Sequence, residues 1–288
     1  MVYTKTQKLG RDLLGDIFKH SKDRGGIMLE CLGMPGSAKT AFILSGLCYV
    51  LEHWHEDLCF FSEVVGAPIQ SFKIQQKPYN QKVHLMVQEG SGIIFRNRET
   101  GEIVDLHPTY FKDYEDCYQK AKKEFCNTVF FKKFKTEKLV NCNIDRIYWT
   151  DFIAHLNTKI GWTWVFIDEM SDLCPYGAPN PIWQSNANFG KICHDLRKCN
   201  TSLWYNTQYK SDIDPRVRSK LQARVFMPGT VVDSNTRVYQ SLIDNLEEDE
   251  KEGNQCVISI AGKFGKIRVT DVFNPVGGFY YDSLYKEG

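Results

Sequence analysis

One octapeptide constrains this sequence more than any other feature. Gly33-Met34-Pro35-Gly36-Ser37-Ala38-Lys39-Thr40 stands between residues 27–32, a short apolar stretch that predicts a strand, and residues 39–51, which predict a helix. The octapeptide fits the pattern GxxxxGK(S/T), except that Ala38 replaces the last glycine. Backbone N–H groups at such a strand–turn–helix junction curl around an anion. We therefore expect a phosphate-bearing ligand to bind where the first strand gives way to its helix.

Each position of this loop has an expected task. Lys39 would reach the β- and γ-phosphates of a nucleotide, and Thr40 would supply a hydroxyl to Mg²⁺. Alanine at position 38 fits only if the backbone there has helical dihedrals, because a positive φ would favour glycine. The alternative is a glycine-rich turn with a chance lysine, which the flanking strand and helix disfavour. The residues expected to line the phosphates are Gly33, Met34, Pro35, Gly36, Ser37, Ala38, Lys39, Thr40 and Ala41.

A second signal is the buried strand predicted over residues 162–167, which ends in Asp168-Glu169. An acid at the carboxyl end of such a strand can hold Mg²⁺ through water, and a carboxylate directly after it can polarise the attacking water. An apolar run followed by two acids can also be a strand edge that meets solvent. Its place in the same series of strands and helices as the loop favours the functional interpretation.

A third signal is the polar end of the strand predicted over residues 202–208. Gln208 is the first candidate for a side chain that bonds the γ-phosphate or the attacking water, and Asn206 is the second. By itself this signal is weak, because strand ends are commonly polar.

The order of these motifs, followed by Asp212-Ile213-Asp214-Pro215-Arg216-Val217-Arg218, resembles the FtsK/HerA superfamily of DNA-pumping ATPases. That superfamily includes viral genome-packaging ATPases and the related Zot-type phage morphogenesis proteins. The resemblance covers residues 27–61 and 162–272. Ala38 departs from the family pattern, no DNA-reading winged helix follows, and the segment between the two regions has no counterpart.

The resemblance implies roles for particular residues. Lys39, Thr40, Asp168, Glu169 and Gln208 would serve the nucleotide. An arginine just before the sensor strand would act in trans on the site of a neighbouring subunit. Arg197 is the first candidate for this role and Arg224 the second, and residues 233–237 resemble the family's D-S-x-R element.

For the fold, we expect a single α/β domain over residues 1–288. It would be a P-loop NTPase of the additional-strand, catalytic-glutamate (ASCE), RecA-like type, with a mainly parallel sheet of order 5-1-4-3-2 flanked by helices. An α+β insertion over residues 64–146 would follow the second strand. Nucleotide would bind at the carboxyl ends of the strands, as is usual in open α/β sheets.

Composition limits the possible partners. The 36 Lys and Arg residues nearly balance the 35 Asp and Glu residues, giving a net charge of +1, so bulk charge does not favour coating of nucleic acid. The longest apolar-rich run, residues 41–51, is shorter than the roughly 20 residues of a membrane span. The N-terminal residues lack a signal-peptide pattern, and we expect a cytoplasmic protein, in the host cytoplasm if it is viral.

The favoured function is an ATP- and Mg²⁺-dependent translocase that packages viral or mobile-element DNA. It would act as a homo-oligomeric ring of five or six subunits with a capsid or portal-like partner. DNA would be gripped by its phosphates, without base readout. Residues 175–184 could face the pore or be a plain surface loop. The candidate DNA contacts are Lys120, Lys122, Lys123, Lys132, Lys133, Lys135 and Lys138. A solvated charged face is at least as good an interpretation of these lysines.

Two alternatives remain. A Zot-like ATPase that extrudes virions would usually carry a membrane span. A nucleotide-switched binding or structural protein would have little use for the water-activating carboxylate of Glu169.

Overall fold

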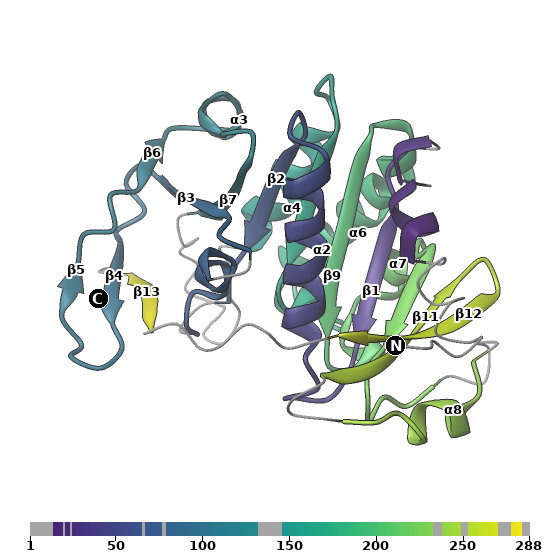
Figure 1. Ribbon diagram of the computed structural model, residues 1–288. Coiled ribbons are helices and arrows are strands. Elements are labelled where there is room, and N and C mark those ends of the chain that lie inside the picture. Colours follow the sequence, from purple (N-terminus) through teal and green to yellow (C-terminus); the bar gives the residue numbers. More distant parts are fainter. Residues whose placement is uncertain are drawn as a thin grey trace.

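A computed structural model of the chain describes residues 14–19, 21–23, 25–64, 67–76, 79–131, 146–232, 238–248, 253–269 and 278–283. Within these ranges the fold is built on a ten-stranded sheet (Figure 1). In spatial order its strands are β12 (Lys263–Val269), β11 (Asn254–Ile260), β10 (Ala223–Phe226), β1 (Met28–Leu32), β9 (Thr201–Thr207), β8 (Thr163–Ile167), β2 (Leu58–Ser62), β7 (Phe125–Phe130), β3 (Lys82–Gln88) and β6 (Thr109–Phe111).

The sheet is mainly parallel. Seven of its nine neighbouring strand pairs are parallel, and the other two belong to the β11–β12 hairpin and its contact with β10. Strands β1, β2, β8 and β9 are buried along their whole length, as expected of parallel strands covered on both faces. The predicted α/β fold with a mainly parallel sheet is confirmed.

The five strands predicted outside the insertion lie side by side as β10-β1-β9-β8-β2, which in chain order reads 5-1-4-3-2. Because all four pairs among them are parallel, their carboxyl ends meet at one edge of the sheet.

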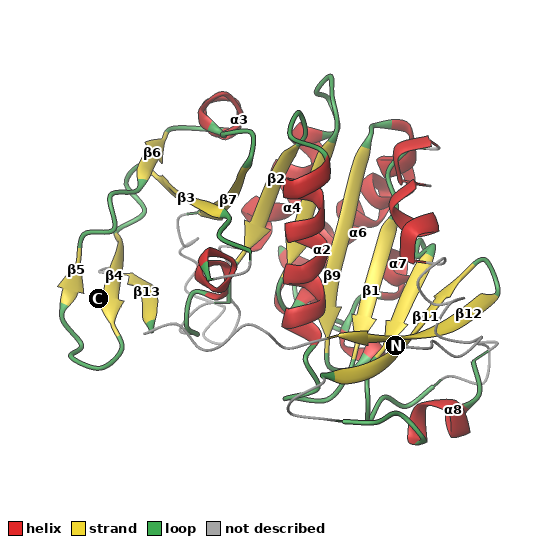
Figure 2. Cartoon of the chain, viewed as in Figure 1, coloured by secondary structure: helices red, strands yellow, loops and turns green. Residues whose placement is uncertain are grey.

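Helices cover both faces of this sheet (Figure 2). Leu29 and Cys31 of β1 pack with α2 and the helical residues 14–19, whereas Met28 packs with the helices of the opposite face. Gly46 lets α2 approach closely, because a Cβ there would lie 2.5 Å from the ring of Trp204. The helices of these two layers are α2 (Lys39–His53) on the first face and α4 (Arg146–Leu156), α5 (Met170–Leu173), α6 (Ile182–Asp195) and α7 (Pro215–Arg218) on the second.

The predicted insertion contributes to two sheets. Its strands β7, β3 and β6 continue the main sheet in parallel beyond β2. Its strands β4 (Ile93–Asn97) and β5 (Ile103–Val104) pair with each other, and β4 also pairs with β13 (Phe279–Ser283) from far along the chain. An apolar core that includes Val87, Phe95, Phe130 and Tyr281 joins this second sheet to the first.

Tyr110, Tyr114, Tyr118 and Phe125 have a spacing that predicts one helix, but the observed helix is shorter than this pattern indicates. Helix α3 covers only Tyr114–Lys120, while Tyr110 lies in β6 and Phe125 lies in β7. The side chain of Asp113 accepts a hydrogen bond from the backbone N–H of Asp116 over 2.9 Å and so starts the helix there.

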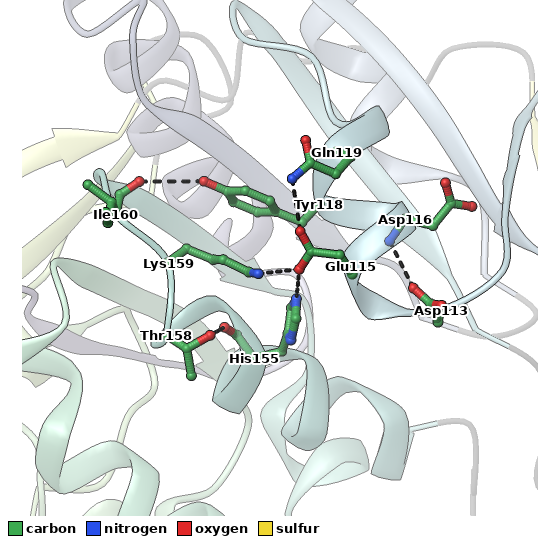
Figure 3. A network of polar contacts seen from close by, with 9 residues as sticks. All are labelled: Asp113, Glu115, Asp116, Tyr118, Gln119, His155, Thr158, Lys159 and Ile160. Atoms are coloured by element: carbon green, nitrogen blue, oxygen red, sulfur yellow. Dashed lines mark hydrogen bonds and ion pairs between the residues drawn. The ribbon is translucent and has the colours of Figure 1, made fainter.

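A polar network fastens α3 to α4 and to the turn that follows α4 (Figure 3). The carboxylate of Glu115 accepts a hydrogen bond from Lys159 and forms an ion pair with His155 at 3.0 Å. The bond from Lys159 holds the pKa of Glu115 at about 2, well below its ordinary value. The hydroxyl of Tyr118 donates to the carbonyl of Ile160 over 3.5 Å. The insertion is therefore docked on the helical layer as well as on the sheet.

The remaining elements are short. The sequence pattern predicts helices over residues 236–246 and 189–198. The first is α8 (Gln240–Asp244), and the second begins earlier, as α6, and ends in the 3₁₀ helix η2 (Leu196–Lys198). The described residues also form the 3₁₀ helices η1 (Gln70–Gln75) and η3 (Lys210–Asp212). Among the described residues, no helix has the length and apolar character needed to cross a membrane.

Candidate nucleotide-binding site

The loop between β1 and α2 has the shape of an anion cradle. Gly33 is required there, because a Cβ would lie 2.3 Å from the hydroxyl oxygen of Ser37 and 2.6 Å from the Cβ of Met227. Gly36 has a φ of +80°, which glycine adopts freely. The loop then enters α2, whose first residues carry the unpaired backbone N–H groups of a helix N-terminus.

The Lys39 ammonium group lies across this loop. Its Nζ donates to the carbonyl oxygens of Gly33 at 2.8 Å and Met34 at 3.0 Å. The side chain is buried, and burial lowers the pKa of Lys39. A phosphate placed in the loop would give this cation an anionic partner.

Ala38 does not have the helical dihedrals that alanine is expected to need at this position. Its φ of 68° and ψ of 25° are left-handed, not helical. The Cβ of alanine in this region meets the following carbonyl, at a cost of about 1–2 kcal/mol. The chain therefore keeps a strained alanine at the position where the loop pattern has glycine.

Asn206 connects the parts of the site. Its Nδ2 donates to Oδ1 of Asp168 over 2.5 Å and approaches Oγ1 of Thr40 at 3.5 Å. Its Oδ1 accepts the backbone N–H of Glu169 over 2.7 Å. The hydroxyl of Thr40 also donates to Oδ1 of Asp168 over 3.0 Å. The ends of β8 and β9 and the start of α2 thus meet around one amide.

Gln208, the first candidate for the sensor, lies beyond the end of β9 and is exposed. Asn206, the second candidate, is inside β9 and only 1% exposed. It is therefore Asn206 that bonds directly to the neighbouring site residues.

Glu169 follows β8 with a left-handed backbone, at a φ of 61°. The hydroxyl of Ser171 donates to its Oε1 over 2.6 Å. Burial raises the pKa of Glu169, which makes its carboxylate more basic than a carboxylate in water. A base of this kind is suited to taking a proton from water.

The residues present fit Mg²⁺ and a triphosphate. The hydroxyl oxygen of Ser37 is buried in the loop without a hydrogen-bond partner. Thr40 and Asp168 offer hard oxygen ligands 3.0 Å apart, and Mg²⁺ is usually held by one or two such groups together with water and phosphate oxygens. Among the described residues, no group of three or more His, Cys, Asp or Glu forms a metal centre by itself.

The two candidate arginines have different surroundings. Arg197 lies in η2, which precedes β9, and the length of that strand separates its backbone by about 20 Å from Asn206. Arg224 of β10 is engaged within its own chain, since its Nε donates to the fully buried Glu30 over 3.2 Å.

The element Asp212-Ile213-Asp214-Pro215-Arg216-Val217-Arg218 after β9 has a structural role. Asp214 caps α7, accepting the backbone N–H of Arg216 over 2.9 Å. The guanidinium of Arg216 bonds the same carboxylate and lies 4.5 Å from the ring centre of Trp183.

The expected DNA contacts are only partly described. Lys120 pairs with Asp116 and Lys123 with Glu56, while Lys122 lies over the ring of Phe125. The remaining lysines, Lys132, Lys133, Lys135 and Lys138, and residues 233–237 lie outside the described residues.

Glu63, which is not among the residues predicted for the site, is a buried acid directly after β2 at the same end of the parallel strands. The pattern that drew attention to Asp168, an acid at the end of a buried strand, is present at this position too.

No protein-family model and no curated protein matches this chain. Solved structures with a similar fold include the genome-packaging NTPase B204 of Sulfolobus turreted icosahedral virus 2 in complex with ATP-gammaS, with a TM-score of 0.49, 13% identity, and coverage of 85% of this chain and 98% of that one. The N-terminal domain of zonular occludens toxin from Neisseria meningitidis has a TM-score of 0.34 and 11% identity, covering 82% and 84%.

The pCW3 conjugation coupling protein TcpA, with ATPgS, has a TM-score of 0.45 and 11% identity, covering 86% of this chain and 61% of that one. The packaging NTPase and the zonular occludens toxin domain are of the kinds that the sequence resemblance named. Likeness at this level concerns the fold and says nothing about substrate or partners.

Proposed function

We propose that this chain is a P-loop ATPase. The observation that carries the proposal is the hydrogen-bond network that joins Thr40, Asp168 and Glu169 through Asn206, beside a loop that Lys39 spans by its bonds to Gly33 and Met34. Phosphoryl transfer depends on positioning and on neutralising charge, and these residues supply both. Residues Gly33 to Ala41 would hold the phosphates, with Lys39 at the β- and γ-phosphates.

Thr40 and Asp168 would hold Mg²⁺, whose chemistry is to neutralise charge on the β- and γ-phosphate oxygens. Glu169 would accept a proton from the attacking water. Asn206 would hold the backbone of Glu169 and the carboxylate of Asp168 in register, and Gln208 stays a candidate for contact with the γ-phosphate.

We further propose that hydrolysis drives DNA translocation, most simply the packaging of viral or mobile-element DNA. The support is the sequence resemblance together with the position of Arg197. The backbone of Arg197 lies at the far end of β9, which argues against a role at its own site, and we propose that it serves the site of a neighbouring subunit. The assembly would be a homo-oligomeric ring of five or six subunits in the cytoplasm, with DNA held by its phosphates and a capsid or portal-like partner.

A Zot-like extrusion ATPase and a nucleotide-switched binding protein are the alternatives. The raised pKa of Glu169, caused by burial, favours turnover over a pure switch, which needs no general base.

The decisive experiment compares wild type with Glu169→Gln. We expect the variant to bind ATP with unchanged affinity and to lose ATP hydrolysis by at least a hundredfold, because the amide cannot accept the proton of water. The rate is measured with and without duplex DNA, alongside the particle mass with a non-hydrolysable nucleotide. Glu247→Gln, which changes an acid 67% exposed beside Arg268, is the control. Full ATP hydrolysis by Glu169→Gln would contradict the assignment of Glu169 as the general base.

A further inference from the structure

A second buried carboxylate at the same edge of the sheet has no part in the proposed hydrolysis. Glu63 directly follows β2 and is 2% exposed. Strand β2 pairs with β8, and the backbone N–H of Asp168 donates to the carbonyl of Ser62 over 3.2 Å. Glu63 is therefore adjacent in sequence to Ser62, which is bonded to the backbone of Asp168, the proposed metal ligand.

The side chain of Glu63 is bonded to the start of η1. Its Oε2 accepts the backbone N–H of Gln70 over 2.9 Å, and its Oε1 accepts that of Ser71 over 2.8 Å. The hydroxyl of Ser71 in turn accepts a hydrogen bond from Thr128 of β7 over 2.9 Å. The carboxylate thus fastens an element of the insertion to the end of β2.

The main chain of Glu63 is bonded to β13, a strand of the second sheet. Tyr281 of β13 donates its hydroxyl to the carbonyl of Glu63 over 3.4 Å. The backbone N–H of Ile69 also donates a hydrogen bond to the carbonyl of Phe279 in β13, over 2.8 Å. One residue therefore joins the edge of the main sheet to η1 and to the second sheet.

Glu63 also lies close enough to Asp168 for their charges to interact. Burial raises the pKa of Glu63 to about 7, and the negative charge of Asp168 adds a smaller rise. The geometric link is the bond from the backbone N–H of Asp168 to the carbonyl of Ser62. A divalent cation that held Asp168 in place would therefore also hold the end of β2, where the carboxylate of Glu63 binds η1.

We propose that Glu63 is a positioning residue through which η1 and β13 respond to Mg²⁺ and nucleotide at Asp168. The inference rests on the proposed function, since it takes the loop and Asp168 as a nucleotide site. Binding would tighten the attachment of η1, and with it the attachment of the insertion and the second sheet, without any contact between these elements and the nucleotide.

Hydrogen–deuterium exchange of the full chain tests this in three states: without ligand, with ATPγS and EDTA, and with ATPγS and Mg²⁺. We expect ATPγS to slow exchange over residues 33–41 in both nucleotide states. Only Mg²⁺ should slow exchange over residues 67–76 and 278–283, at least threefold. Equal exchange of residues 67–76 in all three states would overturn the proposal.

The variant Glu63→Gln keeps the size of the side chain but offers one acceptor oxygen, and its NH₂ group meets a backbone N–H donor. We expect residues 67–76 to exchange faster without ligand and to lose their response to Mg²⁺, while residues 33–41 stay protected by ATPγS. A variant that still responds to Mg²⁺ would contradict the role of Glu63. Glu115→Gln, an exposed acid of the same insertion, should respond as wild type does.

A milder variant keeps the test decisive if Glu63→Gln does not fold. Tyr281→Phe removes only the hydroxyl bonded to Glu63 and should abolish the Mg²⁺ response of residues 278–283. An unchanged response there would count against the link. Absence of ATPγS protection over residues 33–41 would contradict the proposed ATPase itself. Protection over residues 33–41 with no response over residues 67–76 would contradict the Glu63 inference alone.

Discussion

The amide of Asn206 shows what a strand pattern can and cannot specify. Asn206 and Gln208 are two residues apart and so project from the same face of a strand, which is why periodicity cannot separate them. The difference is that β9 ends at Thr207, so that Asn206 is buried against Asp168 while Gln208 is not. The sequence predicts which residue types occupy this edge, but the end of the strand decides which of them is enclosed.

This difference gives a first prediction. Asn206→Ala should weaken Mg²⁺-dependent nucleotide binding or turnover by roughly 10–100-fold, because groups that orient metal ligands have effects of this size. Gln208→Ala is the matched comparison. Titration of nucleotide with and without Mg²⁺ measures both. A larger loss of Mg²⁺-dependent binding in Gln208→Ala than in Asn206→Ala would show that the enclosed amide is not the organising group.

The left-handed backbone of Ala38 gives a second prediction. Ala38→Gly should raise the free energy of unfolding by about 1 kcal/mol, since glycine relieves the Cβ contact and loses part of the gain through its freer unfolded chain. Ala41→Gly, inside α2, should lower it by a similar amount. Chemical denaturation of the two variants compares them. Destabilisation by both substitutions would contradict the positive φ at residue 38.

At the scale of elements, the strands that the sequence identifies best are those that are buried on both faces. The runs in β1, β2, β8 and β9 are apolar and short, and each forms a strand where expected. Partners are harder to foresee, because a strand pattern does not say which sheet the strand joins. Strands β3, β6 and β7 extend the main sheet, while β4 takes β13 as its neighbour. Pairing across such sequence distances depends on contacts that a local pattern does not contain.

The junction between β2 and η1 predicts a particular dependence of stability on pH. The pKa of Glu63 is about 7 in the folded chain and 4.5 ordinarily, so the folded state holds this proton more tightly than the unfolded state. The resulting stabilisation is full below about pH 4.5 and is lost as the pH rises through about 7. Glu63→Gln cannot ionise, so the free energy of unfolding of wild type relative to this variant should fall between these pH values. Urea unfolding at several pH values measures it, and a difference that grows with pH would contradict the assignment.

At the scale of the whole molecule, the positions of the two candidate arginines bear on the proposed assembly. Arg224 is bonded to Glu30, and the backbone of Arg197 lies at the opposite end of β9 from Asn206. In the proposed ring an arginine from a neighbouring subunit would complete the site, and an arginine supplied in trans raises phosphoryl transfer by 10³–10⁵-fold.

Mixing two inactive variants tests that arrangement. Arg197→Ala alone should be inactive as a homomeric ring, and Lys39→Ala alone should be inactive because it lacks the phosphate-binding lysine. Mixed in equal amounts, the two should recover ATP hydrolysis, since an intact site in one subunit then meets an intact arginine in the next. Recovery is read as ATPase rate at constant total protein. Failure to recover, with mixed particles verified by mass, would rule out Arg197 as the residue acting in trans.

The pairing of β13 with β4 has a consequence for biosynthesis. Strand β4 leaves the ribosome early, yet the partner that covers its outer side is the last strand made among those described. Until then its backbone donors and acceptors on that side stay open to other chains, which is a known hazard of an uncovered edge. Nascent copies held close together on one messenger RNA would therefore be most at risk of joining wrongly at this strand until β13 has been made.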